Sequence, residues 1–182
     1  MTVQDSCTLQ IVEALDACGI PYLLSGSFAS NFYGIPRSTK DADFVIQSKG
    51  VGSKFEKKLG NDFLLDPQLT FETVTGTYKQ LVRHAKRNFR IEIFLLSEDP
   101  HDRERFARRR HENLFGRNVW LLSPEDSIIS KLRWSRGKDE DDIRNIISIQ
   151  ASKLDWPYIE KWCQIHGTLA LLQEIRRSVP DI

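Results

Sequence analysis

Two aspartates separated by one residue, Asp41 and Asp43, stand in the apolar segment "DADFVI". Side chains alternate along an extended chain, so both carboxylates point to the same face of a strand. Two acids placed there repel each other and lose hydration, and a divalent cation removes that cost. Carboxylate oxygens suit Mg²⁺, which shares its coordination shell with substrate phosphates. The spacing therefore predicts a site for Mg²⁺ or Mn²⁺.

A third acid, Glu92, lies in the later segment "FRIEIFLL". The alternation of this segment puts Ile91 and Ile93 on one face and Glu92 on the other. An acid on a neighbouring strand would complete a two-metal site with the aspartates, which makes Glu92 the candidate third ligand. The alternative is an ordinary ion pair of Glu92 with Arg90 or Lys86.

Gly26 and Ser27 precede the aspartates and follow the apolar segment "YLL". Glycine lets a phosphate approach the backbone, and the amides that begin a helix bind anions. The serine hydroxyl supplies a further donor. A phosphate at this turn and a metal ion at the aspartates together describe a nucleoside triphosphate bound for phosphoryl or nucleotidyl transfer.

The elements that must position these residues follow from hydrophobic periodicity and turn signals. We expect helices over 5–18, 27–33 and 52–60, and strands over 22–24, 41–47 and 89–96, the last within a β-rich stretch over 63–96. The basic run over 102–111 is predicted to be helical, and "NVWLL" a final strand. Ser123 as N-cap and Pro124 at the next position begin a series of helices. The prediction is an α/β core over 1–122 and a helical part over 123–182 packed on it.

The segment "SGSFASNFYGIPRSTKDADFVI" resembles the signature of the nucleotidyltransferase superfamily typified by DNA polymerase beta. That signature is an apolar residue, Gly-Gly or Gly-Ser, about a dozen residues, and then Asp-x-Asp or Asp-x-Glu between apolar residues. The chain is especially similar to small bacterial members, namely antibiotic nucleotidyltransferases and abortive-infection toxins. The later segment "LLSPEDSIISKLRWSRGKDEDDIRNI" also resembles the helices that follow their core. The resemblance, over about residues 20–150, implies a mixed sheet with flanking helices and a helical C-terminal part.

The activity that the resemblance implies is transfer of a nucleoside monophosphate from a triphosphate to an acceptor hydroxyl, with two Mg²⁺ ions. Asp41 and Asp43 would then bind both metal ions. Glu92 would bind the catalytic ion and act as base for the acceptor. Gly26 and Ser27 would hold the terminal phosphates.

Three further residues have two interpretations each. Lys131, which matches a lysine of the related proteins, either neutralises triphosphate charge or is an exposed helix lysine. Arg37 either contacts a phosphate or the acceptor, or forms a structural ion pair. Asp142 either favours the start of a helix through its dipole or pairs with a basic residue from the active-site side.

The sequence does not identify the acceptor, which the superfamily leaves open among a small molecule, tRNA and protein. Homodimerisation or a cognate antitoxin are possible partnerships. The alternative function is a catalytically silent nucleotidyltransferase fold that acts as a binding or regulatory partner. The basic run Arg103–Arg110 distinguishes acceptors, because a nucleic acid acceptor would require it to border the cleft.

Composition sets the remaining limits. The 182 residues contain 26 Lys and Arg and 25 Asp and Glu, so net charge gives no general attraction to nucleic acid or membrane. Three scattered cysteines without a CxxC motif predict neither disulfides nor a zinc site. The four histidines are widely spaced and predict no ligand pair. The N-terminus lacks the features of a signal peptide, and no apolar run is long enough to span a membrane, which together predict a cytoplasmic protein.

Overall fold

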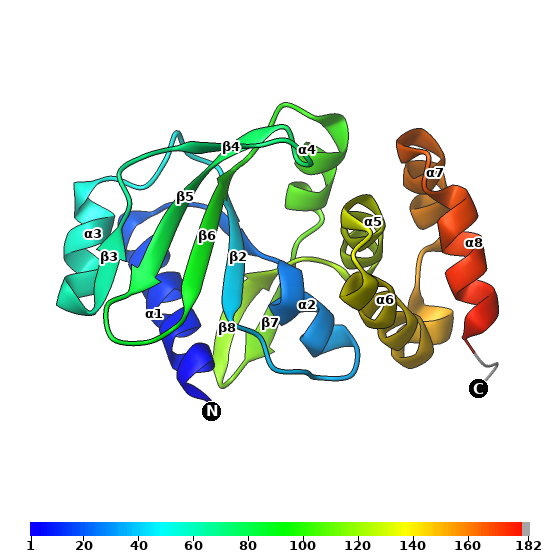
Figure 1. Ribbon diagram of the computed structural model, residues 1–182, viewed down its shortest axis with the longest axis horizontal. Helices are drawn as coiled ribbons and strands as arrows, with labels where there is room; N and C mark the ends of the chain where they lie inside the picture. The colour runs from blue at the N-terminus through cyan, green and yellow to red at the C-terminus, as the bar shows by residue number, and fades with distance from the viewer. Residues whose placement is uncertain (180–182) are drawn as a thin grey trace.

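The computed structural model describes residues 1–179, which form one mixed β-sheet flanked by helices (Figure 1). The strand order is β3-β5-β6-β2-β1-β8-β7. The short strand β4 pairs with the first three residues of β5. The strands are β1 (Tyr22–Leu24), β2 (Asp41–Ile46), β3 (Phe63–Leu65), β4 (Thr70–Glu72), β5 (Thr77–His84), β6 (Arg90–Leu95), β7 (Arg110–Leu114) and β8 (Arg117–Leu121). The helices are α1 (Val3–Cys18), α2 (Gly26–Tyr33), α3 (Ser53–Leu59), α4 (Pro100–Ala107), α5 (Pro124–Trp134), α6 (Gly137–Gln150), α7 (Trp156–His166) and α8 (Leu169–Ser178).

The centre of the sheet is its most buried part, and it holds β2 between β6 and β1. The β2–β6 pair is parallel, and the β1–β2 pair is antiparallel. Phe44, Ile46, Ile91 and Ile93 are fully buried, as the alternation of the two segments predicts. Burial of these side chains fixes the register, because a slip by one residue would turn every apolar side chain outward. The predicted α/β fold is confirmed.

Helices cover the sheet in two groups. In Figure 1, α1 and α3 lie together on the left, and α5, α6, α7 and α8 gather on the right. Ser123 caps α5 through a hydrogen bond from the Asp126 amide (3.1 Å), and Pro124 takes the first helical position, as predicted. The division into two parts at residue 122 stays a prediction. Within residues 1–179, no helix combines the length and apolar composition needed to cross a membrane.

The predicted helix over 102–111 is wrong in its second half. The helix α4 ends at Ala107, and Arg110 already begins β7. The strand pairs with β8 through a tight turn in which Phe115 and Gly116 both have positive φ (54° and 83°). Such a turn matches the twist of a hairpin, so strand pairing overrides the helical preference of the arginine run.

Candidate active site

The three predicted acids come together at the centre of the sheet. In the parallel β2–β6 pair, Asp43 lies directly opposite Glu92, and Asp41 is two residues before Asp43 on the same face. All three side chains line one cavity of about 250 Å³. The strand register therefore brings together carboxylates that lie about fifty residues apart in the chain.

The phosphate-binding turn predicted at Gly26 and Ser27 lines the same cavity. The Ser25 amide donates to the Asp43 carbonyl oxygen (2.8 Å), so the start of α2 is fixed against β2. Gly26 has a φ of +58°, and a Cβ at this position would lie 1.9 Å from Asp43 Oδ2. No side chain but hydrogen fits between α2 and the acid. The glycine is thus required by the close approach of α2 to Asp43.

Three carboxylates, those of Asp41, Asp43 and Glu92, lie together at the floor of this cavity. Loss of hydration, followed by the neighbouring charges of Asp41 and Glu92, raises the pKa of Asp43 to about 7. Glu92 forms an ion pair with Lys79 (3.2 Å) rather than with Arg90 or Lys86. The protein therefore holds an acid whose ionised form is costly without additional positive charge.

These residues fit a divalent cation. They offer hard carboxylate oxygens from two adjacent strands, the donor type that Mg²⁺ and Mn²⁺ prefer. A bound cation would offset both causes of the raised Asp43 pKa, the loss of hydration and the neighbouring charges of Asp41 and Glu92. Two basic residues pair with these acids, Lys79 with Glu92 (3.2 Å) and Arg90 with Asp41 (4.0 Å), and neither of them pairs with Asp43.

Arg37 does not line the cavity but contacts Ser27 in the predicted phosphate-binding turn. It forms a two-pronged ion pair with Asp142, with both nitrogen–oxygen distances at 2.7 Å. The same guanidinium donates to Ser27 Oγ (3.2 Å). Of the two interpretations of Arg37, the structure contains the ion pair, and Asp142 binds a basic residue; a contact of Arg37 with phosphate or the acceptor stays a prediction.

Lys131 is buried, which excludes the interpretation of an exposed helix lysine. Its Nζ donates to Asp142 Oδ2 (2.6 Å) and to Asp139 Oδ1 (3.3 Å), and it lines the cavity. Burial alone would raise the pKa of Asp142, but hydrogen bonds from Arg37 and Lys131 outweigh it and hold that pKa below its usual range. Asp142 is thus a charged hub between α2, α5 and α6.

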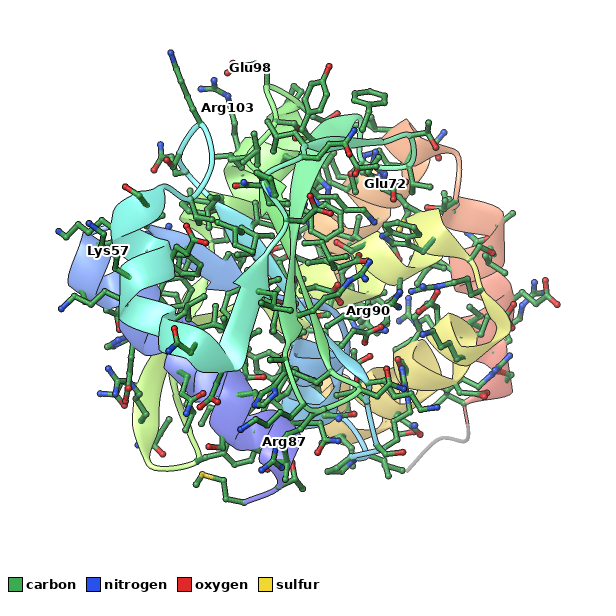
Figure 2. The ribbon with its side chains drawn as sticks, turned by 60° about the vertical axis from the view of Figure 1, so that its left-hand side comes forward. Lys57, Glu72, Arg87, Arg90, Glu98 and Arg103 are labelled. Atoms are coloured by element: carbon green, nitrogen blue, oxygen red, sulfur yellow. The ribbon has the colours of Figure 1, made fainter. Side chains whose placement is uncertain are left out.

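Several basic residues in the cavity wall were not predicted as site residues. Lys79 on β5, Arg90 on β6 and Arg136 before α6 all line it. Arg136 also pairs with Asp139 (2.7 Å) across the first turn of α6. Alternation along β5 gives the face of the strand on which Lys79 lies. It identifies Lys79 as a site residue only once β5 is known to pair with β6, which carries Glu92. Figure 2 labels Arg90 and Glu72, two lining residues that lie on the side of the sheet facing α5 and α6.

The basic run Arg103–Arg110 is largely occupied by internal contacts. Its partners are Glu98 for Arg103, Asp102 for Arg105, Asp126 for Arg108, Trp120 for Arg109 and Glu125 for Arg110. Of these five arginines, Arg105 reaches the cavity wall. In Figure 2, Arg103 and Glu98 lie beside each other at the top, away from Arg90. The run therefore forms no continuous basic border to the cavity.

Comparison with known protein families decides the relationship. Residues 25–179 match the family described as "Nucleotidyltransferase of unknown function (DUF6036)". The chain belongs to this nucleotidyltransferase family. The match spans every acid and the phosphate-binding turn described above. The resemblance of the sequence to the nucleotidyltransferase superfamily is thereby confirmed. No functionally curated protein matches the chain.

Solved structures share the nucleotidyltransferase fold at low sequence identity. ANT(2'')-Ia in complex with adenylyl-2''-tobramycin is 15% identical, with a TM-score of 0.59 over 92% of this chain and 98% of that one. The lincosamide antibiotic adenylyltransferase LnuA, lincomycin-bound, is 12% identical, with a TM-score of 0.55 over 82% and 99%. An antigenic nucleotidyltransferase-like protein from Paracoccidioides brasiliensis is 20% identical, with a TM-score of 0.56 over 100% and 96%.

Proposed function

We propose that this nucleotidyltransferase is catalytically active and moves a nucleoside monophosphate from a triphosphate to an acceptor hydroxyl with the help of Mg²⁺ or Mn²⁺. The observation that carries the proposal is the register of Asp43 opposite Glu92, with Asp41 on the same face and the Gly26 turn against Asp43. A silent descendant of the fold would have no need to keep three acids together, because their repulsion destabilises the folded chain.

Each residue has a defined task in this proposal. Asp41 and Asp43 would hold both divalent ions, and Glu92 would hold the catalytic one. These ions would polarise the phosphate and neutralise the charge that develops during transfer. Glu92 would also accept the proton of the acceptor hydroxyl. The amides at the start of α2 and the Ser27 hydroxyl would bind the terminal phosphates.

Basic residues around the cavity would neutralise the leaving pyrophosphate. Lys131 lies in the wall with its charge partly balanced by Asp139 and Asp142. We assign Arg37 a positioning task, since it reaches Ser27 Oγ and not the cavity. A fixed Ser27 hydroxyl costs less entropy when the phosphates bind.

A small molecule is the favoured acceptor. Two proteins with this fold were solved with antibiotic ligands: ANT(2'')-Ia with adenylyl-2''-tobramycin, and the lincosamide antibiotic adenylyltransferase LnuA with lincomycin. The internal pairing of the run Arg103–Arg110 argues against a tRNA acceptor, because a polynucleotide needs free cations along its path. A protein acceptor, a homodimer and a cognate antitoxin remain alternatives for the test below. We place the reaction in the cytoplasm, where nucleoside triphosphates are made.

The test supplies each α-labelled nucleoside triphosphate with Mg²⁺ or Mn²⁺ to the full chain. The acceptors are tobramycin, lincomycin, total tRNA and cell lysate. We expect label transfer to one acceptor class, and loss of transfer when Asp41→Asn and Asp43→Asn are combined. Glu56→Gln, on the exposed surface of α3, is the matched control and should keep full activity.

Other outcomes separate the alternatives. Transfer that persists in the double variant would refute the metal mechanism. Triphosphate binding without transfer to any acceptor, equally strong in the double variant, would support the silent binding partner instead. Label on tRNA or on a lysate protein would replace the small-molecule acceptor while leaving the chemistry intact.

A further inference from the structure

Two histidines that lie far apart in the sequence come into contact, one from α4 and one from α7. His101 is in the first turn of α4, and His166 is the last residue of α7. Their ring centroids are 4.9 Å apart. Asp99, the residue that caps α4, joins them, and one potential ligand atom from each of the three residues lies within 4.8 Å of the others. The wide spacing of the histidines had predicted no such group.

His101 has a buried nitrogen with nothing to bind. The side chain is fully buried, and within residues 1–179 its Nδ1 has no hydrogen-bond partner. The Nδ1 of His166 is also buried and without a partner in the described part of the chain. A buried polar atom without a partner is destabilising. A metal ion bound to both nitrogens would accept their lone pairs and remove this destabilisation.

The other face of His101 is arranged as in a metal-binding histidine. Its Nε2 lies 3.1 Å from Asp126 Oδ1, and this carboxylate also accepts from Tyr158 (2.7 Å) and Ser123 (2.7 Å). With Nε2 donating to this carboxylate, the free lone pair of the ring lies on Nδ1. Metal-binding histidines commonly donate their second nitrogen to a carboxylate in this way.

Asp99 adds a carboxylate without giving up its task at the helix. Its Oδ1 accepts from the amides of His101 (2.9 Å) and Asp102 (3.2 Å). No hydrogen bond among the described residues engages its Oδ2. One oxygen can therefore cap α4 while the other turns to a cation.

We propose that Asp99, His101 and His166 form a second metal site, separate from the catalytic acids, which binds Zn²⁺ or a similar transition-metal ion. Two imidazoles and one carboxylate are a donor set typical of zinc and poorly suited to Mg²⁺, which prefers oxygen ligands. A water molecule would supply the fourth ligand. The ion would join the start of α4, which directly follows the sheet, to the end of α7, and so fix the C-terminal helices to the core.

The nearby Trp162 provides an optical report on this site. Its ring centroid lies 4.7 Å from that of His101 and 5.6 Å from that of His166. The test adds Zn²⁺ to the metal-free full chain in excess Mg²⁺, which occupies the catalytic acids. Calorimetry measures stoichiometry and affinity. Tryptophan fluorescence of the full chain reports its four tryptophans together, of which Trp162 lies beside the site. Co²⁺ replaces Zn²⁺ to show the visible absorption of a four-coordinate ion.

We expect one equivalent of Zn²⁺ and a higher melting temperature with Zn²⁺. His166→Gln should weaken Zn²⁺ binding by more than the roughly 10- to 100-fold that loss of an outer partner costs. His111→Gln, an exposed histidine on β7, is the matched control and should bind as wild type. Asp99→Asn retains the acceptor that caps α4 and should also weaken binding.

The proposal fails if wild type takes up no Zn²⁺ in excess Mg²⁺. It also fails if His166→Gln binds Zn²⁺ as tightly as His111→Gln. Circular dichroism establishes that each variant folds. If His166→Gln does not fold, the same comparison with Asp99→Asn decides the outcome, since unchanged binding in that variant refutes the three-residue site.

Discussion

Replacing Asp142 with asparagine should cost the protein a large part of its stability. The carboxylate is 2% exposed and accepts four hydrogen bonds: two from Arg37, one from Lys131 and a longer one from Ser30 (3.4 Å). Asp142→Asn keeps the shape of the side chain but removes its charge. It also turns an NH₂ group toward two cations. Lys131 then remains buried with Asp139 as its one carboxylate partner among the described residues.

The magnitude follows from what is left behind. Breaking a buried ion pair costs about 3–5 kcal/mol, because the remaining charge stays buried without compensation. Arg37 is 32% exposed and can turn to water, and Lys131 keeps Asp139. We therefore expect a loss of about 3 kcal/mol in the free energy of unfolding, at the lower end of that range. Asp141→Asn is the matched control, because its side chain is 74% exposed, and it should change stability by less than about 0.5 kcal/mol.

The assay is urea unfolding at several pH values. The folded-state pKa of Asp142 is lowered, so its contribution is complete above the unfolded pKa of about 3.9 and is lost as pH falls through the folded pKa. The difference between wild type and Asp142→Asn should therefore be constant from pH 7 to 5 and shrink below pH 4. If Asp142→Asn is as stable as Asp141→Asn at pH 7, the proposed stabilising role of the Asp142 contacts is refuted. A difference that grows toward low pH would refute it as well.

Two further changes test the cavity floor. Gly26→Ala places a methyl group on a residue with positive φ and presses it against Asp43. We expect the free energy of unfolding to fall by at least about 1–2 kcal/mol from the backbone conformation alone. Triphosphate binding, measured by calorimetry, should be lost. Asp43→Asn, measured in EDTA, should raise the free energy of unfolding at pH 8 by up to about 4 kcal/mol, since its pKa rises from an unfolded value of about 3.9 to about 7. That gain should fade as pH falls from 7 toward the unfolded-state pKa of about 3.9, and it should vanish below that pH, where the carboxyl is protonated in both states. A gain independent of pH would contradict the electrostatic origin.

The parts of the site that the sequence predicts are those whose chemistry is local. Asp41 and Asp43 share a face because two residues of a strand always do. Gly26 and Ser27 begin a helix after a strand, and both signals lie within a few residues. Glu92 stands out because its strand is otherwise apolar. Each inference needs only the period of an element, which the sequence carries directly.

The parts that the sequence does not predict depend on which elements are neighbours. Arg37 and Asp142 are 105 residues apart, and Lys79 meets Glu92 only because β5 pairs with β6. The second half of the basic run becomes a strand because β8 offers a partner and a tight turn joins the two. Local propensity cannot report such partners, since tertiary pairing overrides it.

The charged hub at Asp142 connects stability to the proposed chemistry. A buried cluster of charges is seldom the most stable way to fill a core, and apolar residues of similar volume often serve as well or better. Here the cluster does what apolar residues cannot, because Arg37 donates to Ser27 Oγ and to Asp142 with the same guanidinium. Through this contact the helix α6 helps to position the Ser27 hydroxyl, to which we assign phosphate binding. In this interpretation the C-terminal helices are part of the active site, and a displacement of α6 would change triphosphate affinity without touching any of the three acids.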